Sequence, residues 1–232
     1  MAKFDLLIQH TLKWEGDHGA DPQDNALKLG HSGVLGKTIN PKTKKPYDRK
    51  FPNNYVHTSS GVIWNTYVEY CKEKKKKPNA SEFLLMDKKL WQDIYKTLFW
   101  DKILGDKINS QGIAENLMEA RWIGGGANLI RDTIRYLNKE YNANLPVTGT
   151  VTQNLVNSLN KNINHRSKYL NIIKYLYDQR LKYYQGLSDW KRFGAGWTNR
   201  LNELYNRAIK YPHTILNLAW FFKLFGVAMF FF

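Results

Sequence analysis

Two acidic residues near the N-terminus, Glu15 and Asp24, are spaced so that they could act together on a glycosidic bond. An apolar helical pattern runs directly into Glu15, and burial there would disfavour the charged form and raise the pKa of its carboxyl group. Asp24 follows in a loop that contains Gly and Pro, where solvent would keep it ionised. Glycoside hydrolysis uses such a pair, one carboxyl donating a proton and the other directing water. The same spacing is also typical of a helix end followed by a turn, so the pair alone does not establish a catalytic site.

The elements that must position these residues are mostly helices. Apolar residues recur at i, i+3 and i+4 over residues 3–14, which predicts an amphipathic helix ending beside Glu15. Residues 17–60 contain many Gly and Pro residues and little helical period, which favours a long loop or a small β-hairpin region. Further helices are predicted over residues 61–71, 87–98, 111–122, 127–142, 152–160 and 166–185, and along an apolar face between residues 197 and 209. The sequence therefore predicts a mainly α fold with a small irregular or β insertion.

Composition indicates a globular and strongly basic protein. The chain has 232 residues, 43% of them hydrophobic, which is enough to form a core. Thirty-five Lys and Arg against 20 Asp and Glu give a net charge of +15, which should attract a polyanion without identifying it. The single cysteine, Cys71, excludes an internal disulfide and is expected to be a structural thiol. No Cys and His cluster has metal-ligand spacing, and the GGGAN segment (124–128) follows no strand, so we expect no metal site and no cofactor.

The two termini give different expectations about membranes. Asp5 interrupts the apolar run at the N-terminus, and no small-residue cleavage site follows, so no signal peptide is expected. Residues 215–232 are almost wholly apolar and would reach roughly 27 Å as a helix, just short of a bilayer core of about 30 Å. This segment is either a membrane contact or a hydrophobic helix packed on the domain or on a partner.

Several segments, in one order along the chain, resemble family 108 of the glycoside hydrolases. They are FDLLIQHTLKWEG, DPQD, HTSSGVIWNTY and WQDIYKTLFWD in the first half, and ARWIGGGANLIRDTIRYLN, LPVTGTVTQNLV and FGAGWTNRL in the second half. The similarity covers nearly all of residues 4–207. It implies a lysozyme-like catalytic domain (1–108), a helical peptidoglycan-binding-like region (109–210) and a hydrophobic C-terminal tail (211–232).

The resemblance implies a muramidase that cleaves the β-1,4 bond between N-acetylmuramic acid and N-acetylglucosamine. The catalytic Glu of the family falls on Glu15, its loop Asp on Asp24 and its Thr on Thr58. We expect Glu15 to act as the general acid, and Asp24 and Thr58 to position water for an inverting reaction with carboxyls about 6.5 to 9.5 Å apart. The chain departs from the family motifs at Asp17, at Thr148 and by an insertion between Asp24 and residue 57.

Other residues are weaker candidates for substrate binding. His18 could line the cleft or simply occupy a loop. Trp122 could stack on a sugar ring or belong to the core. Arg200 is expected to be structural, with its charge paired inside the helical packing.

The expected partner is bacterial peptidoglycan, with membrane contact through residues 215–232 and no nucleic acid. The enzyme would act at the bacterial cell wall or periplasm, as a phage endolysin or a virion-associated lysin. It would be made in the host cytoplasm without a signal peptide or be carried in a virion. Three alternatives stay open: a lytic transglycosylase, a non-catalytic envelope-binding or virion structural protein, and a basic nucleic-acid binder that lacks a recognisable motif.

Overall fold

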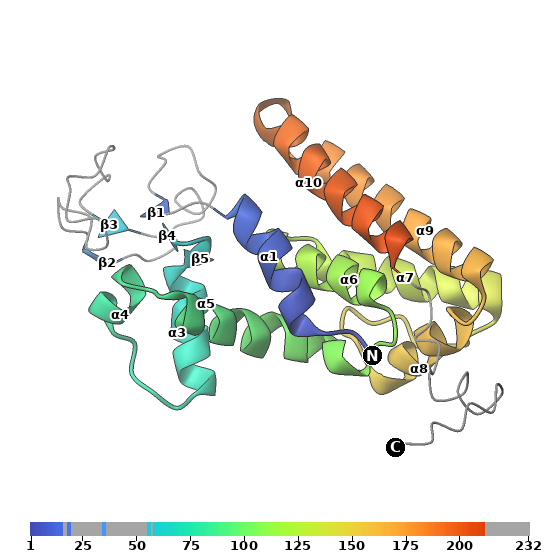
Figure 1. Cartoon of the computed structure of the whole chain (residues 1–232), viewed down its shortest axis with the longest axis horizontal. Coiled ribbons are helices and arrows are strands. Elements are labelled where there is room, and N and C mark those ends of the chain that lie inside the picture. The colour runs from blue at the N-terminus through green and yellow to red at the C-terminus, as the bar shows by residue number, and fades with distance from the viewer. Residues whose placement is uncertain (16–17, 20–33, 36–54, 57, 212–232) are drawn as a thin grey trace, which may run out of the picture. The chain divides into compact units, whose positions relative to one another are not determined.

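The computed structural model describes residues 1–15, 18–19, 34–35, 55–56 and 58–211. The described chain is mainly helical (Figure 1), which confirms the predicted lysozyme-like α fold with a small β insertion. The first part contains α1 (Phe4–Trp14), β1 (His18–Gly19), β2 (Val34–Leu35), β3 (Tyr55–Val56), β4 (Thr58–Ser59), β5 (Val62–Ile63), α3 (Trp64–Glu73), α4 (Ala80–Leu84) and α5 (Lys88–Tyr95). A π-helical turn (Lys96–Trp100) and two 3-10 turns (Asp101–Ile103, Gly105–Lys107) lead to α6 (Gln111–Ile123), α7 (Gly126–Tyr141), α8 (Gln153–Asn162), α9 (Arg166–Gln185) and α10 (Trp190–Lys210).

The strands form two small antiparallel sheets. One sheet has the order β1-β4-β5, and the other pairs β2 with β3. Ser60 and Gly61 form the two-residue loop between β4 and β5, and their φ angles are +50° and +78°. Positive φ at both central residues is typical of a type I′ hairpin turn, whose twist matches that of the flanking strands. Glycine at the second position adopts this backbone without a steric penalty.

The chain divides into two compact units, which we describe separately. The N-terminal unit comprises Ile8–Phe99, and the C-terminal unit combines Met1–Leu7 with the chain from Trp100 onward. The division therefore falls within α1 and within the π-helical turn. The domain boundary expected at residue 108 remains a prediction.

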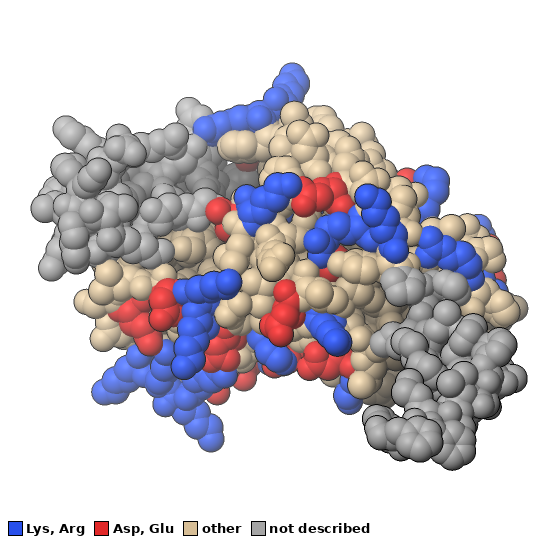
Figure 2. Space-filling view, viewed as in Figure 1, with Lys and Arg blue, Asp and Glu red and all other residues tan. Residues whose placement is uncertain are grey.

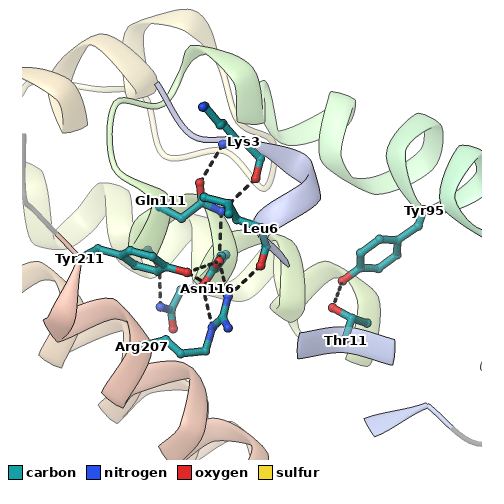
Figure 3. Close-up of polar contacts among 10 residues, drawn as sticks. Lys3, Leu6, Thr11, Tyr95, Gln111, Asn116, Arg207 and Tyr211 are labelled. Atoms are coloured by element: carbon teal, nitrogen blue, oxygen red, sulfur yellow. Dashed lines mark hydrogen bonds and ion pairs between the residues drawn. The ribbon is translucent and has the colours of Figure 1, made fainter. Parts of the chain in front are cut away.

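Helix α6 forms the centre of the C-terminal unit, and residues 111–120 of this helix are all buried. Glu115 and Glu119, which lie one turn apart, are fully buried and are paired with Arg207 and Arg200 of α10, both at 2.8–3.0 Å. The side chains of Gln111, Arg207 and Tyr211 (Figure 3) all bond to the carboxylate of Glu115. A buried carboxylate without such partners would be strongly destabilising. The structural role expected for Arg200 is confirmed.

The core of the N-terminal unit is rich in aromatic rings. Trp64 and Tyr67 of α3 pack against Phe83 of α4, with ring centroids 5.1 and 5.6 Å away. The hydroxyl of Tyr67 donates to the carboxylate of Glu82, and the ammonium group of Lys76 donates to the same carboxylate at 3.0 Å. Offset and edge-to-face aromatic pairs add stability beyond their buried area. This packing explains how a unit with short helices and strands holds together.

A second cluster of the same kind lies on the same helix. The hydroxyl of Tyr70 donates to Asp93 at 2.6 Å, and Lys74 pairs with the same carboxylate at 3.0 Å. Cys71, which directly follows Tyr70 on α3, is fully buried, and burial raises the pKa of its thiol. The expected structural role of this cysteine agrees with its position in the core.

The structure differs from the predicted helices at three places. Helix α4 is five residues long, too short to show a periodic apolar pattern, and it begins where the Asn79 side chain accepts from the backbone N–H of Glu82. Asp87 caps α5 as expected, accepting from the N–H of Leu90 at 2.7 Å, but the helix predicted to Leu98 becomes π-helical at Lys96. The last helix begins at Trp190, before the predicted apolar face.

The surface is mixed in charge. Figure 2 shows Lys and Arg distributed over the visible face, with Asp and Glu between them.

Among the described residues, no helix has the length and apolar character needed to cross a membrane. The tail at 215–232, for which membrane contact was expected, lies outside the described residues.

Candidate active site

Glu15 lies directly after the last residue of α1 and completes its final turn. Its backbone N–H donates to the carbonyl of Thr11 at 3.2 Å, so the chain is still helical as it reaches Glu15. The residue is half-buried. A carboxyl group held on a rigid helix end, with partial access to solvent, is suited to act on a bound substrate.

The carboxylate of Glu15 lies against the hairpin turn between β4 and β5. A Cβ atom at position 61 would lie 2.9 Å from Cδ of Glu15 and closer still to Oε2, so only glycine leaves room for the carboxylate in this position. Gly61 is therefore required twice, for its positive φ angle of +78° and for the space it leaves. The structure thus brings together the end of α1 and the turn of the hairpin.

A chain of buried contacts connects both sides of this arrangement. The hydroxyl groups of Thr11 and Tyr95 are 2.9 Å apart (Figure 3), which attaches the last turn of α1 to α5. Tyr95 stacks on Trp91 with ring centroids 4.6 Å apart, and the Trp91 indole N–H donates to the carbonyl of Ser60 at 2.9 Å. Trp91 is 1% exposed. Helix α5 therefore holds both the helix that ends at Glu15 and the turn that touches its carboxylate.

Thr58 lies on β4, in the same hairpin. It is half-buried and pairs with Ile63 of β5 on one side and with Gly19 of β1 on the other. His18 of β1 lies opposite Ser59. The three-stranded sheet therefore places the backbones of Thr58 and His18 on adjacent strands, and His18 follows Glu15 by only three residues in the chain.

Two other predicted site residues are Asp24 and Trp122. Asp24 lies outside the described residues. Trp122 belongs to the C-terminal unit, where it is half-buried near the end of α6. Of the GGGAN segment after it, Gly124 and Gly125 form the turn from α6 to α7, with φ angles of +123° and +79°, and the other three residues begin α7.

Sequence reasoning missed Gly61 and Trp91 as parts of the site. Gly61 stands in HTSSGVIW, where the Ser-Gly pair before an apolar run is the signal for a tight hairpin turn. Trp91 has the correct spacing for the apolar face of α5, so the sequence indicated its burial but not the hydrogen bond of its indole N–H.

Comparison with solved structures defines the class of fold. The structure of SagA from Brucella abortus is similar with a TM-score of 0.59 and 20% sequence identity, over 89% of this chain and 93% of that chain. Identity at this level shows a shared fold and nothing finer. A search of curated protein sequences found no significant match.

The family model for glycosyl hydrolase 108 matches residues 8–125, which is half of the chain and includes the whole N-terminal unit. The protein belongs to glycosyl hydrolase family 108. It is therefore a peptidoglycan hydrolase that acts at the cell wall.

Proposed function

We propose that the protein is a muramidase, which hydrolyses the β-1,4 bond between N-acetylmuramic acid and N-acetylglucosamine. The observation that carries this proposal is the position of the Glu15 carboxylate at the end of α1, against the hairpin that contains Thr58. A helix-end acid facing a small sheet is suited to donate a proton to a glycan chain. Family membership supplies the peptidoglycan substrate class.

In the proposed reaction, Glu15 gives its proton to the glycosidic oxygen as the bond from that oxygen to C1 of N-acetylmuramic acid breaks. Water, held by Asp24 and the hydroxyl of Thr58, attacks C1 from the opposite face of the ring. Asp24 accepts the proton from this water, so that the products contain one added water molecule. Attack on the opposite face inverts the configuration at C1.

Two further residues are proposed to bind sugars of the substrate without taking part in the reaction. We propose that His18 contacts the sugar next to the scissile bond, since β1 adjoins the strand of Thr58. Trp122 is proposed to stack on a sugar ring, because the flat face of an indole suits the apolar face of a pyranose.

The biological role of the protein is proposed to be that of a phage endolysin or virion-associated lysin. Residues 215–232 are proposed to contact the membrane.

The decisive experiment combines activity on purified cell walls with product analysis. Wild type, Glu15→Gln and the control Glu69→Gln, an exposed carboxylate on α3, are compared by zymography on purified peptidoglycan. We expect lysis by wild type and by Glu69→Gln and none by Glu15→Gln. Lysis by Glu15→Gln at the wild-type rate would remove Glu15 from the proposed role.

Mass spectrometry and NMR of the products then distinguish the reaction types. A muramidase leaves a reducing N-acetylmuramic acid end, and inversion releases it first as the α-anomer. An anhydro sugar would identify a lytic transglycosylase, and a β-anomer would identify a retaining enzyme. Either result contradicts the role proposed for water held by Asp24 and Thr58.

Membrane contact by the tail is tested separately. A chain truncated after Tyr211 and the full chain are compared for sedimentation with liposomes. Loss of sedimentation on truncation is expected, and equal sedimentation would contradict the proposed contact.

A further inference from the structure

The C-terminal unit contains a polar groove that the proposed reaction does not use. Its volume is about 540 Å³, within the range of ligand sites. The walls come from the loop after α7, from one face of α8 and from the start of α9. The lining residues are Tyr141, Asn142, Ala143, Asn144, Leu145, Asn154, Asn157, Ser158, Lys161, Asn162 and Lys168.

One wall of the groove is a continuous polar stripe on α8. The five lining residues of α8 stand at positions i, i+3, i+4, i+7 and i+8, starting at Asn154, so they share one helical face. The opposite face carries Leu155, Val156 and Leu159, which are buried. Asparagine is a weaker helix former than Ala, Lys or Glu, so its repeated use on this face indicates a role for the carboxamides themselves.

The other wall is a loop with a fixed conformation. Asn142 and Asn144 both have φ angles of +51°, and the Asn138 side chain makes two hydrogen bonds of 2.8 Å to the backbone of Leu145. The loop therefore presents its asparagines in a defined arrangement before any ligand binds. Pre-organisation of this kind lowers the entropic cost of binding.

The chemistry of the groove is that of a site for amides and carboxylates. Five asparagines and two lysines line it, and no Asp or Glu does. The side chains of Asn142, Asn144 and Asn154 make no hydrogen bond to another described residue, so their donors and acceptors are available to a ligand. A carboxamide pairs with a peptide group through one donor and one acceptor, and a lysine supplies the charge for a carboxylate.

Both lysines are in a position to serve such a ligand. The ammonium group of Lys168 lies 5.0 Å from the centroid of the Tyr141 ring and 3.5 Å from Oδ1 of Asn162. Lys161 is exposed and forms no ion pair with any carboxylate in the described part of the chain. The groove thus combines peptide-pairing groups with uncompensated positive charge, which a neutral sugar chain would not require.

We propose that this groove binds an acidic peptide segment, the chemical class to which the carboxylate-bearing peptide stems of peptidoglycan belong. The inference rests on the proposed action on peptidoglycan and adds a second recognition site, for the peptide part of the polymer. Binding there would hold the enzyme on its substrate between cleavage events.

The test is an NMR titration of the isotope-labelled full chain with three probes. The first is the synthetic stem peptide N-acetyl-L-Ala-γ-D-Glu-L-Lys-D-Ala, the second is the same peptide with its carboxylates amidated, and the third is chitotetraose. The first probe is expected to shift the resonances of residues 141–168, and the shifts should weaken as salt screens the lysines. Amidation should weaken binding about tenfold, because it removes the charge from the acceptor. Chitotetraose should leave these resonances unchanged.

Variants then identify the groups responsible. Lys161→Gln and Asn154→Ala should each weaken peptide binding by about tenfold. Asn144→Gly removes a carboxamide at a position where glycine accepts the positive φ, so the loop keeps its shape. The matched controls Lys191→Gln and Asn171→Ala change exposed residues that do not line the groove, and they should bind as wild type does.

Two results would overturn the proposal: shifts of these resonances by chitotetraose but not by the peptide, or unchanged peptide binding in Lys161→Gln and Asn154→Ala together. Neither depends on catalysis, because the stem peptide contains no glycosidic bond. Failure of the muramidase assignment, seen as lysis by Glu15→Gln, would leave these binding results unaffected.

Discussion

Carboxylates are held differently in the two units of the molecule. In the C-terminal unit, Glu115 and Glu119 are fully buried in the middle of α6, and each is paired with an arginine of α10. In the N-terminal unit, Glu15 is half-buried at the end of a helix, and its carboxylate lies against a glycine turn. A carboxylate surrounded by arginine and amide donors stabilises the fold but cannot reach a substrate. A carboxylate at a helix end beside a glycine can be approached from solvent.

The largest expected effect separates chemistry from stability. Glu15→Gln should lower kcat on purified cell walls by about 10²- to 10⁴-fold, the usual contribution of a general acid, without changing the free energy of unfolding. Glu119→Gln should do the reverse and destabilise the fold, because it leaves the buried guanidinium of Arg200 without its counter-charge. Turbidity assays and urea unfolding of both variants measure this contrast. A large loss of stability in Glu15→Gln would show that its role is structural.

The second largest effect is a loss of folding stability when the buried ion pair between Arg200 and Glu119 is broken. Arg200→Met leaves Glu119 buried without its partner and should lower the free energy of unfolding by about 3–5 kcal/mol. The double variant Glu119→Gln with Arg200→Met should recover part of this loss, because no uncompensated charge remains. Equal stability of the single and double variants in urea would contradict the pairing.

The glycine turn gives a smaller effect that is specific to activity. Gly61→Ala introduces a methyl group where the Glu15 carboxylate lies, and kcat should fall by about 10- to 100-fold from misplacement of the acid. The positive φ should also cost about 1 kcal/mol of stability. Gly196→Ala is the matched control, since no atom lies within 4 Å of an added methyl group there. A kcat unchanged in Gly61→Ala would show that the carboxylate is free to move.

The smallest effect concerns acid stability. The Tyr67 hydroxyl and Lys76 hold the pKa of Glu82 below its ordinary value of 4.5. Because the folded pKa is the lower one, this stabilisation is present above pH 4.5 and is lost as the pH falls through that value and below the folded pKa. Glu82→Gln should cost about 0.5 kcal/mol at pH 7, and the difference should shrink as the pH falls below 4.5. Urea unfolding across this pH range checks this, and a difference that stays constant in acid would contradict it.

Much of the fold could be predicted from the sequence, because long helices repeat their apolar residues with a regular period. The helix that ends at Glu15, the cap at Asp87 and the long helices of the C-terminal unit all follow from local patterns. Helix α4 is too short to show a period, and the π-helical turn after Tyr95 depends on packing instead of local sequence.

The site was less accessible to prediction. The acid could be chosen from its position at a helix end and from family resemblance. The carboxylate of Glu15 contacts Gly61, and the indole N–H of Trp91 bonds to the carbonyl of Ser60 in the same turn. These contacts join residues far apart in the chain, and no local pattern encodes them. The roles proposed for Asp24, Thr58, His18 and Trp122 remain predictions.

The single cysteine offers a way to watch one unit open independently of the other. Cys71 is fully enclosed in the N-terminal unit, and its thiol is the only one in the chain. A thiol reagent can modify it only after that unit opens, so the alkylation rate under native conditions reports the opening free energy of the half that carries Glu15. Substrate or inhibitor that binds this half should slow alkylation in proportion to its affinity.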